Sequence, residues 1–152
     1  DLHSFPTRRS SDLTRTFSKA YGLAGLRVGY AISSTEIADY INRVREPFNV
    51  NHVAQSAAIA ALADDEYLQT SIKVNNAGVK QLEAGFVKLG LTFIDSSANF
   101  IAVEVVNAND TFEKLLREGV IVRPVEMPNY LRVSVGTEDE NTRLLEALET
   151  VL

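Results

Sequence analysis

The sequence contains no cysteine and only two histidines, His3 and His52. Without cysteine the chain can form neither disulfide bonds nor thiolate metal sites, and this composition fits a reducing compartment. Two histidines far apart in the sequence, without a third, argue against a zinc site and against a Ser-His-Asp triad. We therefore expect no metal site, and we expect a cytoplasmic protein.

The sequence also lacks a membrane-spanning segment and an excess of positive charge. No apolar run approaches the roughly 20 residues that cross a bilayer. The net charge of −5 argues against nucleic-acid binding, which needs a basic surface. The chain has 152 residues, of which 45% are hydrophobic and 23% charged, as in one ordinary globular domain. We expect a small-molecule substrate as partner, with no nucleic acid and no membrane.

The first residues are polar and aperiodic, and no initiator methionine precedes them. They lack the apolar segment of a signal peptide. We expect residues 1–13 to be a non-native or disordered leader that lies outside the fold.

The remaining chain alternates between strand and helix patterns. Asn51 suits the cap of an alanine-rich helix, and Gly90 suits the end of a longer one. Thr137 and Glu140 have the spacing of a capping box, which opens the last helix. We expect strands at 13–17, 27–32, 91–94, 99–105, 120–123 and 130–135, and helices at 33–46, 51–63, 65–89, 110–118 and 137–152.

The segment 14–30 is the most informative stretch. Ser18 precedes Lys19, and Arg27 follows after a stretch that contains Gly22 and Gly25. A lysine amine forms a Schiff base with an aldehyde, whereas a hydroxyl and a guanidinium bind phosphate. The pattern suits a cofactor that carries both an aldehyde and a phosphate.

This run resembles the lysine motif of the fold-type-I aminotransferases, which use pyridoxal 5′-phosphate (PLP). The resemblance covers about residues 14–152. It implies an α/β fold class, the C-terminal half of a fold-type-I PLP-dependent transferase. The implied domains are the end of the large PLP-binding domain at 14–64, a linking helix at 65–89, and a small α+β C-terminal domain at 90–152. The resemblance also implies a homodimer for the full-length enzyme.

The same resemblance assigns roles to single residues. It implies that Lys19 is catalytic, holds PLP as a Schiff base and then moves the proton next to the substrate nitrogen. Ser18 and Arg27 would hold the cofactor phosphate. Thr16 is a weaker member of that set.

Four further stretches resemble histidinol-phosphate aminotransferases, which implies transamination between histidinol phosphate and 2-oxoglutarate in histidine biosynthesis. Arg132 would hold the anionic end of the substrate. Arg123 is a second candidate for substrate binding, and a surface strand charge is the alternative. The stretches are R-E-P-F-N-V-N (45–51), A-N-F-I (98–101), G-V-I-V-R-P (119–124) and Y-L-R-V-S-V-G-T (130–137).

Two alternatives stay open. Aromatic-amino-acid aminotransferases share the lysine and arginine motifs, and a threonine-phosphate decarboxylase is a more distant relative. The chain can also be a truncated fragment without independent catalysis, because the family's aspartate at the pyridine nitrogen and its stacking aromatic residue have no counterpart here.

Overall fold

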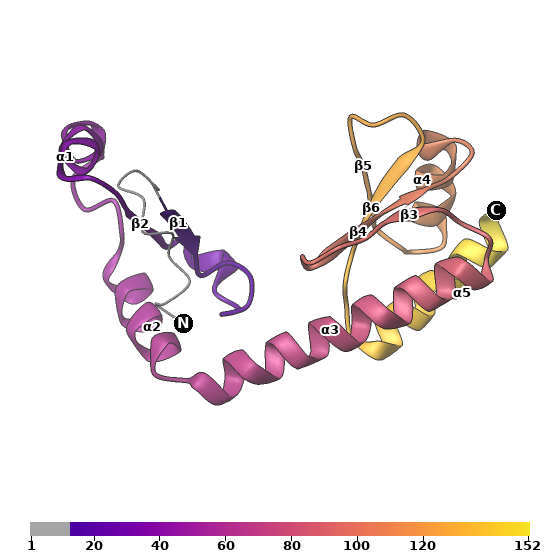
Figure 1. Cartoon of the computed structure of the whole chain (residues 1–152), viewed down its shortest axis with the longest axis horizontal. Coiled ribbons are helices and arrows are strands. Elements are labelled where there is room, and N and C mark those ends of the chain that lie inside the picture. Colours follow the sequence, from indigo (N-terminus) through magenta and orange to yellow (C-terminus); the bar gives the residue numbers. More distant parts are fainter. Residues whose placement is uncertain (1–12) are drawn as a thin grey trace. The chain divides into compact units, whose positions relative to one another are not determined.

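The computed structural model describes residues 13–152. They form two compact units that divide inside a long helix, α3 (Asp65–Lys88), between Gln69 and Thr70. Figure 1 labels the elements of both units along the chain. Of the predicted leader, only Leu13 is described, as the first residue of β1, and residues 1–12 lie outside the described part.

The first unit is built on a small antiparallel hairpin. β1 (Leu13–Thr16) pairs with β2 (Gly29–Ile32), and a short 3-10 helix, η2 (Ala24–Leu26), lies between the strands in sequence. α1 (Thr35–Val44) and α2 (His52–Leu62) follow. The buried hydrophobic residues of this unit are Phe17, Val28, Ala54 and Ala58.

The helix caps in this unit agree with the sequence in one case and differ in the other. Asn51 caps α2, since its side-chain oxygen accepts the N–H of Ala54 at 2.8 Å. The predicted start of α1 at Ser33 is one residue early. Ser34 is the cap and accepts the N–H of Ile37 at 3.3 Å, whereas the Ser33 hydroxyl donates to the carbonyl oxygen of Ser34.

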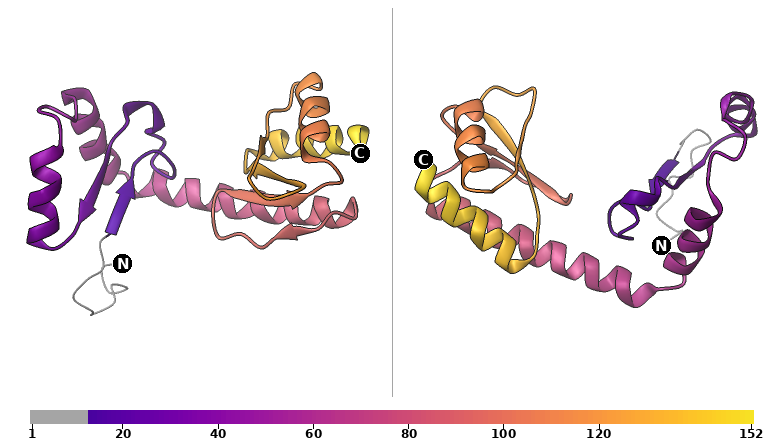
Figure 2. Two further views of the ribbon diagram at one scale, coloured as in Figure 1. Left: turned by 90° about the horizontal axis from the view of Figure 1, so that it is seen from above. Right: turned by 180° about the vertical axis from the view of Figure 1, so that it is seen from behind.

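The second unit contains an antiparallel four-stranded sheet in the order β3-β4-β6-β5. Its strands are β3 (Phe93–Ile94), β4 (Phe100–Glu104), β5 (Arg123–Pro124) and β6 (Tyr130–Ser134). α4 (Ala108–Arg117) connects β4 to β5, and α5 (Glu138–Val151) follows β6. Figure 2 shows this sheet and its helices from two further directions.

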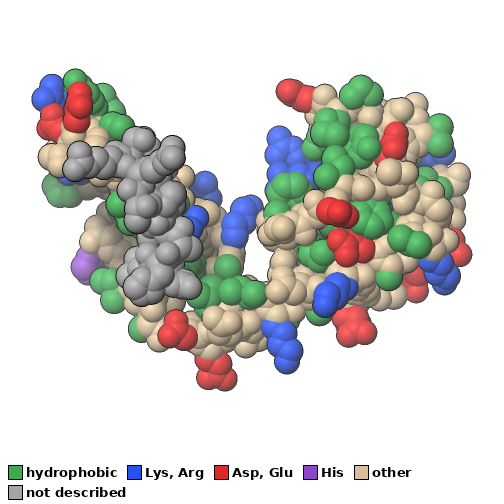
Figure 3. Space-filling model, in the orientation of Figure 1, with side chains coloured by type: hydrophobic (Ala, Val, Ile, Leu, Met, Phe, Trp, Pro, Cys, Tyr) green, Lys and Arg blue, Asp and Glu red, His purple; other side chains and the backbone are tan. Residues whose placement is uncertain are grey.

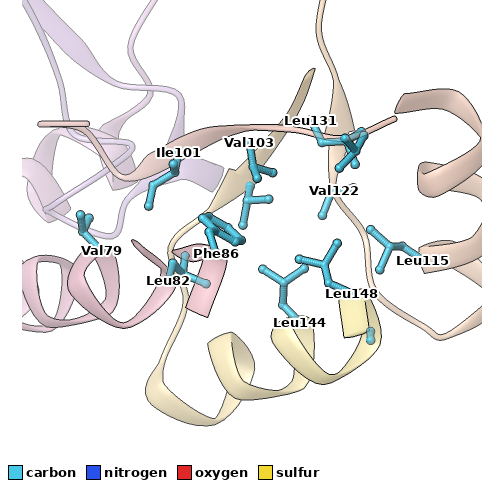
Figure 4. Packing of buried hydrophobic residues seen from close by; sticks show 13 residues of the cluster. Val79, Leu82, Phe86, Ile101, Val103, Leu115, Val122, Leu131, Leu144 and Leu148 are labelled. Carbon is cyan, nitrogen blue, oxygen red and sulfur yellow. The ribbon is translucent and has the colours of Figure 1, made fainter. Parts of the chain in front are cut away.

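One face of this sheet packs against helices. Ile101, Val103, Leu131 and Val133 point into the core, where Phe86 of α3 is fully buried. Each large side chain removed from water here contributes about 1.5–3 kcal/mol. Figure 4 shows how α3, α4 and α5 fill the same cluster with Leu82, Leu115, Leu144 and Leu148. The packed face leaves the alternate residues of β4 and β6 on the opposite side of the sheet.

The strand predicted at 120–123 is shorter in the structure. Only Arg123 and Pro124 pair with β6. The N–H of Val120 instead donates to the carbonyl oxygen of Leu115 at 2.9 Å, which closes the end of α4. The chain therefore joins the sheet only at Arg123. In the described residues, we find no helix that is both long enough and apolar enough to cross a membrane.

Candidate active site

Lys19 lies in a tight turn at the closed end of the β1–β2 hairpin. The N–H of Gly22 donates to the carbonyl oxygen of Lys19 at 2.9 Å. Gly22 has a φ of 69°, a left-handed conformation that glycine adopts without steric cost. The hairpin continues to the base of this loop, because Phe17 donates to the carbonyl oxygen of Val28 at 3.1 Å. Lys19 itself is exposed.

Aromatic side chains support the strand that leads to Lys19. Phe17 is only 4% exposed. The ring centroids of Tyr21 and Tyr30 lie 5.0 and 6.1 Å from that of Phe17, in tilted arrangements that aromatic pairs favour. The loop that carries Lys19 is thus supported by packed aromatic side chains, whereas Lys19 itself is exposed to solvent.

Three predicted phosphate ligands gather at this end of the hairpin. Ser18 follows Phe17 and Arg27 precedes Val28, so both flank the same backbone hydrogen bond. The N–H of Ser18 donates to Oγ1 of Thr16 at 3.1 Å. The structure therefore brings the backbones of all three residues together.

The donor groups of this set fit a phosphate. Arg27 donates through Nη1 to the carbonyl oxygen of Ala24 at 2.7 Å, which leaves other guanidinium N–H groups available. The hydroxyls of Thr16 and Ser18 can each still donate. Within residues 13–152, neither Lys19 nor Arg27 pairs with a carboxylate. An anion is therefore the natural ligand of this group.

Arg27 also has an unusual backbone. Its φ of 52° and ψ of 46° are left-handed, at the end of η2. This conformation costs a non-glycine residue on the order of 1–2 kcal/mol. This backbone conformation sets the direction in which the Arg27 side chain leaves the chain, just before β2 begins.

The second group of predicted site residues lies on the sheet of the second unit. Arg123 of β5 is the register partner of Arg132 of β6. Leu131 and Val133 are 0% and 2% exposed, so Arg132 lies on the face opposite the core, as the alternation predicts. Its guanidinium carbon lies 4.0 Å from the centroid of the Phe100 ring, a cation–π contact.

Two arginines directly opposite each other are destabilising unless an anion lies nearby, since like charges repel across a ladder. Figure 3 shows basic side chains gathered beside β5, next to hydrophobic ones. This pair can bind a phosphate or carboxylate through two planar guanidinium groups.

The second unit has a pocket of about 460 Å³, but neither Arg123 nor Arg132 lines it. Residues 119–122, the end of β6 and the first turns of α5 line it, with Glu140 and Arg143 as its charged side chains. Both charges already have partners, because Glu140 accepts from Thr137 and Arg143 donates to the carbonyl oxygen of Glu118 at 2.7 Å. Across residues 13–152 we find no cluster of side chains that could hold a metal ion.

The sequence did not identify two features of the structure. Tyr67 of α3 lies against Gly22, and the buried Asn141 joins α3 to α5 through Gln81. No local spacing links these residues. The one sequence signal is Gly22 itself, since a glycine can mark a place where another group approaches the backbone closely.

Comparison with known proteins identifies the family of the chain. The family described as aminotransferase class I and II matches residues 9–148. The chain therefore belongs to the class I and II aminotransferases.

Its relatives include a histidinol-phosphate aminotransferase of Methylobacillus flagellatus, 54% identical over 143 residues, which are 92% of this chain and 39% of that protein. Histidinol-phosphate aminotransferase 2 of Pseudomonas fluorescens is 59% identical over 144 residues, with the same coverage. The chain spans about 39% of the length of these relatives.

A solved structure gives the same fold. The histidinol-phosphate aminotransferase of Sinorhizobium meliloti, in complex with pyridoxal-5′-phosphate, matches 99% of this chain and 44% of that chain. The TM-score is 0.86 at 29% sequence identity. The predicted fold class, part of a fold-type-I PLP-dependent transferase, is confirmed.

Proposed function

We propose that the complete protein containing this chain is a PLP-dependent aminotransferase that acts on histidinol phosphate and 2-oxoglutarate in histidine biosynthesis. The single observation that carries the proposal is the position of Lys19, in a tight turn where the backbones of Thr16, Ser18 and Arg27 also lie close together. The names of the relatives support the choice of substrate.

The residues of the lysine loop would hold the cofactor at its two ends. Nζ of Lys19 would hold the aldehyde carbon, and Thr16, Ser18 and Arg27 would bind the phosphate. When bound, PLP supplies an electron sink for the charge that develops beside the substrate nitrogen. The S. meliloti structure, a complex with pyridoxal-5′-phosphate, supports the assignment.

Lys19 would also move the proton of the reaction. Its amine would take the proton from the carbon beside the substrate nitrogen, hold it at Nζ and then donate it to the carbon on the other side of that nitrogen. A lysine suits this role because its long side chain reaches both positions from one fixed backbone. In the described residues no carboxylate pairs with its amine and restrains it.

Arg123 and Arg132 would bind the phosphate ester of the substrate. Each can donate charge-assisted hydrogen bonds, and a doubly charged phosphate offsets the repulsion between the two guanidinium groups. Phe100 limits the movement of Arg132, because its ring lies directly against the guanidinium group. An arginine held in this way loses less side-chain freedom when the substrate binds.

Borohydride reduction of the full-length protein with PLP, followed by peptide mapping, tests the cofactor assignment. We expect the label on Lys19, and the variant Lys19→Ala should lose transamination while it keeps its fold. Label on another lysine, such as Lys73 or Lys80, would contradict the proposal.

Comparison of substrates tests the specificity. We expect the highest kcat/KM with histidinol phosphate as amino donor. A higher value with phenylalanine would favour an aromatic-amino-acid aminotransferase. Release of CO2 from threonine phosphate would favour a decarboxylase. The homodimer and the cytoplasmic location implied by the family stay predictions, which light scattering of the full-length protein and cell fractionation test.

A further inference from the structure

We propose that Tyr67 is a positioning residue for Lys19, because its ring holds the turn from Lys19 to Gly22 against the start of α3. The proposal rests on the proposed function only for the role that it gives to Lys19. The contact itself joins two segments of the first unit that lie far apart in the sequence.

The contact between Tyr67 and Gly22 is close. A Cβ atom added to Gly22 would lie 2.6 Å from the hydroxyl oxygen of Tyr67 and 3.5 Å from its Cζ. Tyr67 therefore occupies the space that any side chain at position 22 would need. The same glycine closes the turn, because its N–H donates to the carbonyl oxygen of Lys19 at 2.9 Å.

The backbone of Tyr67 is itself fixed. Its N–H donates to Oδ1 of Asp64 at 2.9 Å, so Asp64 holds the first turn of α3. The side chain is 51% exposed, and its hydroxyl end is the part that reaches Gly22. Because the backbone of Tyr67 is held in the first turn of α3, its side chain can restrict the movement of the turn that contains Gly22.

The turn is thus held from two directions. Tyr21 lies within the turn, and its ring packs against the buried Phe17 at a centroid distance of 5.0 Å. Tyr67 contacts the closing residue, Gly22, from α3. Because Lys19 is exposed, the backbone from which its side chain leaves sets the positions that its amine can reach. A small displacement of that backbone moves Nζ away from the reacting atoms.

The first experiment uses the full-length protein and compares Tyr67→Ala with Gln69→Ala, an exposed position next to it on α3. We expect hydrogen exchange of the Gly22 amide, measured without PLP, to increase several-fold in Tyr67→Ala and to stay at the wild-type rate in Gln69→Ala. We expect kcat of Tyr67→Ala to fall by about tenfold to a hundredfold, as for other displaced catalytic groups. KM for histidinol phosphate should change little, because Arg123 and Arg132 are untouched.

A double-mutant cycle tests the contact directly. Gly22→Ala should displace the Tyr67 ring and increase exchange at residues 19–22. Added Tyr67→Phe removes the colliding oxygen, leaves Cζ as the nearest atom at 3.5 Å and should restore part of the protection. Gly90→Ala is the matched control, since Gly90 has a φ of 70° and no atom within 4 Å of an added Cβ. It reports the backbone strain alone.

The outcomes separate this inference from the proposed function. If borohydride labels Lys19 normally but Tyr67→Ala leaves both the exchange and kcat unchanged, the positioning role is wrong and the function stands. Additive effects of Gly22→Ala and Tyr67→Phe would also overturn it. If the wild type is labelled at another lysine while exchange still responds to Tyr67→Ala, the proposed function fails and the contact remains.

Discussion

Arg123 and Arg132 lie directly opposite each other in the antiparallel β5–β6 ladder, so two guanidinium groups extend from one face of the sheet. Side chains of directly paired residues are close enough to interact, and like charges at such positions repel. The core on the other face, with Leu131 and Val133 buried, prevents Arg132 from turning inward. The arrangement costs stability in the absence of an anion and favours the binding of one.

Removal of Arg132 should therefore weaken the binding of the anionic substrate. A charge-assisted hydrogen bond contributes about 1.5–3 kcal/mol, so we expect Arg132→Leu to lower kcat/KM for histidinol phosphate by roughly tenfold to a hundredfold, mainly through KM. PLP affinity should stay near that of the wild type. Arg117→Leu, an exposed arginine in the last turn of α4, is the control. Equal kinetics for Arg132→Leu and the wild type would refute the assignment.

Arg27 should contribute to cofactor affinity. We expect Arg27→Ala to weaken PLP binding by roughly tenfold to a hundredfold in a spectroscopic titration of the full-length protein. Arg27→Gly separates the side chain from the backbone, because glycine adopts the observed φ of 52° freely. Both variants should bind PLP weakly. Normal affinity in Arg27→Gly would assign the effect to backbone strain instead of phosphate binding.

The capping box of α5 should make stability depend on pH. The backbone N–H and the hydroxyl of Thr137 donate to the Glu140 carboxylate at 2.8 and 3.0 Å and lower the pKa of Glu140 below its usual 4.5. A folded-state pKa below the unfolded one stabilises the fold above the unfolded value, and this stability is lost as the pH falls through the folded value.

Urea unfolding of the wild type and of Glu140→Gln across this acidic range tests the effect. We expect the difference in unfolding free energy between the two proteins to shrink as the pH falls below about 4.5. Glu149→Gln, an exposed position on the same helix, should show no such trend. A difference independent of pH would mean that the capping carboxylate does not titrate in this way.

The buried Asn141 should be important for the stability of the second unit. Its side chain accepts the N–H of Gly136 at 2.9 Å and donates to Gln81 at 3.0 Å. Truncation of the Asn141 side chain leaves these groups without hydrogen-bond partners. Each buried group left unpaired costs about 1–3 kcal/mol of stability. We expect Asn141→Ala to lower the unfolding free energy by about 3 kcal/mol, whereas the exposed Asn109→Ala changes it by less than about 0.5 kcal/mol. Similar values for both would show that the network contributes little.

The 152-residue chain alone should not catalyse transamination. The chain spans about 39% of the length of its histidinol-phosphate aminotransferase relatives, so we expect part of the cofactor site to lie outside it and its affinity for PLP to be low. The assay supplies PLP, histidinol phosphate and 2-oxoglutarate and measures glutamate. Turnover of about 1 per second or faster, typical of enzymes, would show that this expectation is wrong.

The features that depend on residues close together in the sequence could be predicted. The Thr137–Glu140 box, the Asn51 cap and the alternation that places Arg132 opposite the core all follow from side chains a few positions apart. Such interactions form within one turn of a helix or along one strand, so their spacing can be recognised in the amino-acid sequence. The lysine motif was also visible, because Ser18, Lys19 and Arg27 lie in one short loop.

Which distant residues meet could not be predicted, because it depends on how the elements pack in three dimensions. Arg123 faces Arg132 because the chain enters the sheet there, after Val120 has closed α4, and not at the predicted residue 120. Tyr67 reaches Gly22, and Asn141 bonds to Gln81, 60 residues away. Contacts of this kind depend on how whole elements pack and on which backbone groups are already bonded. No local periodicity encodes them, since each element can satisfy its own pattern in several registers.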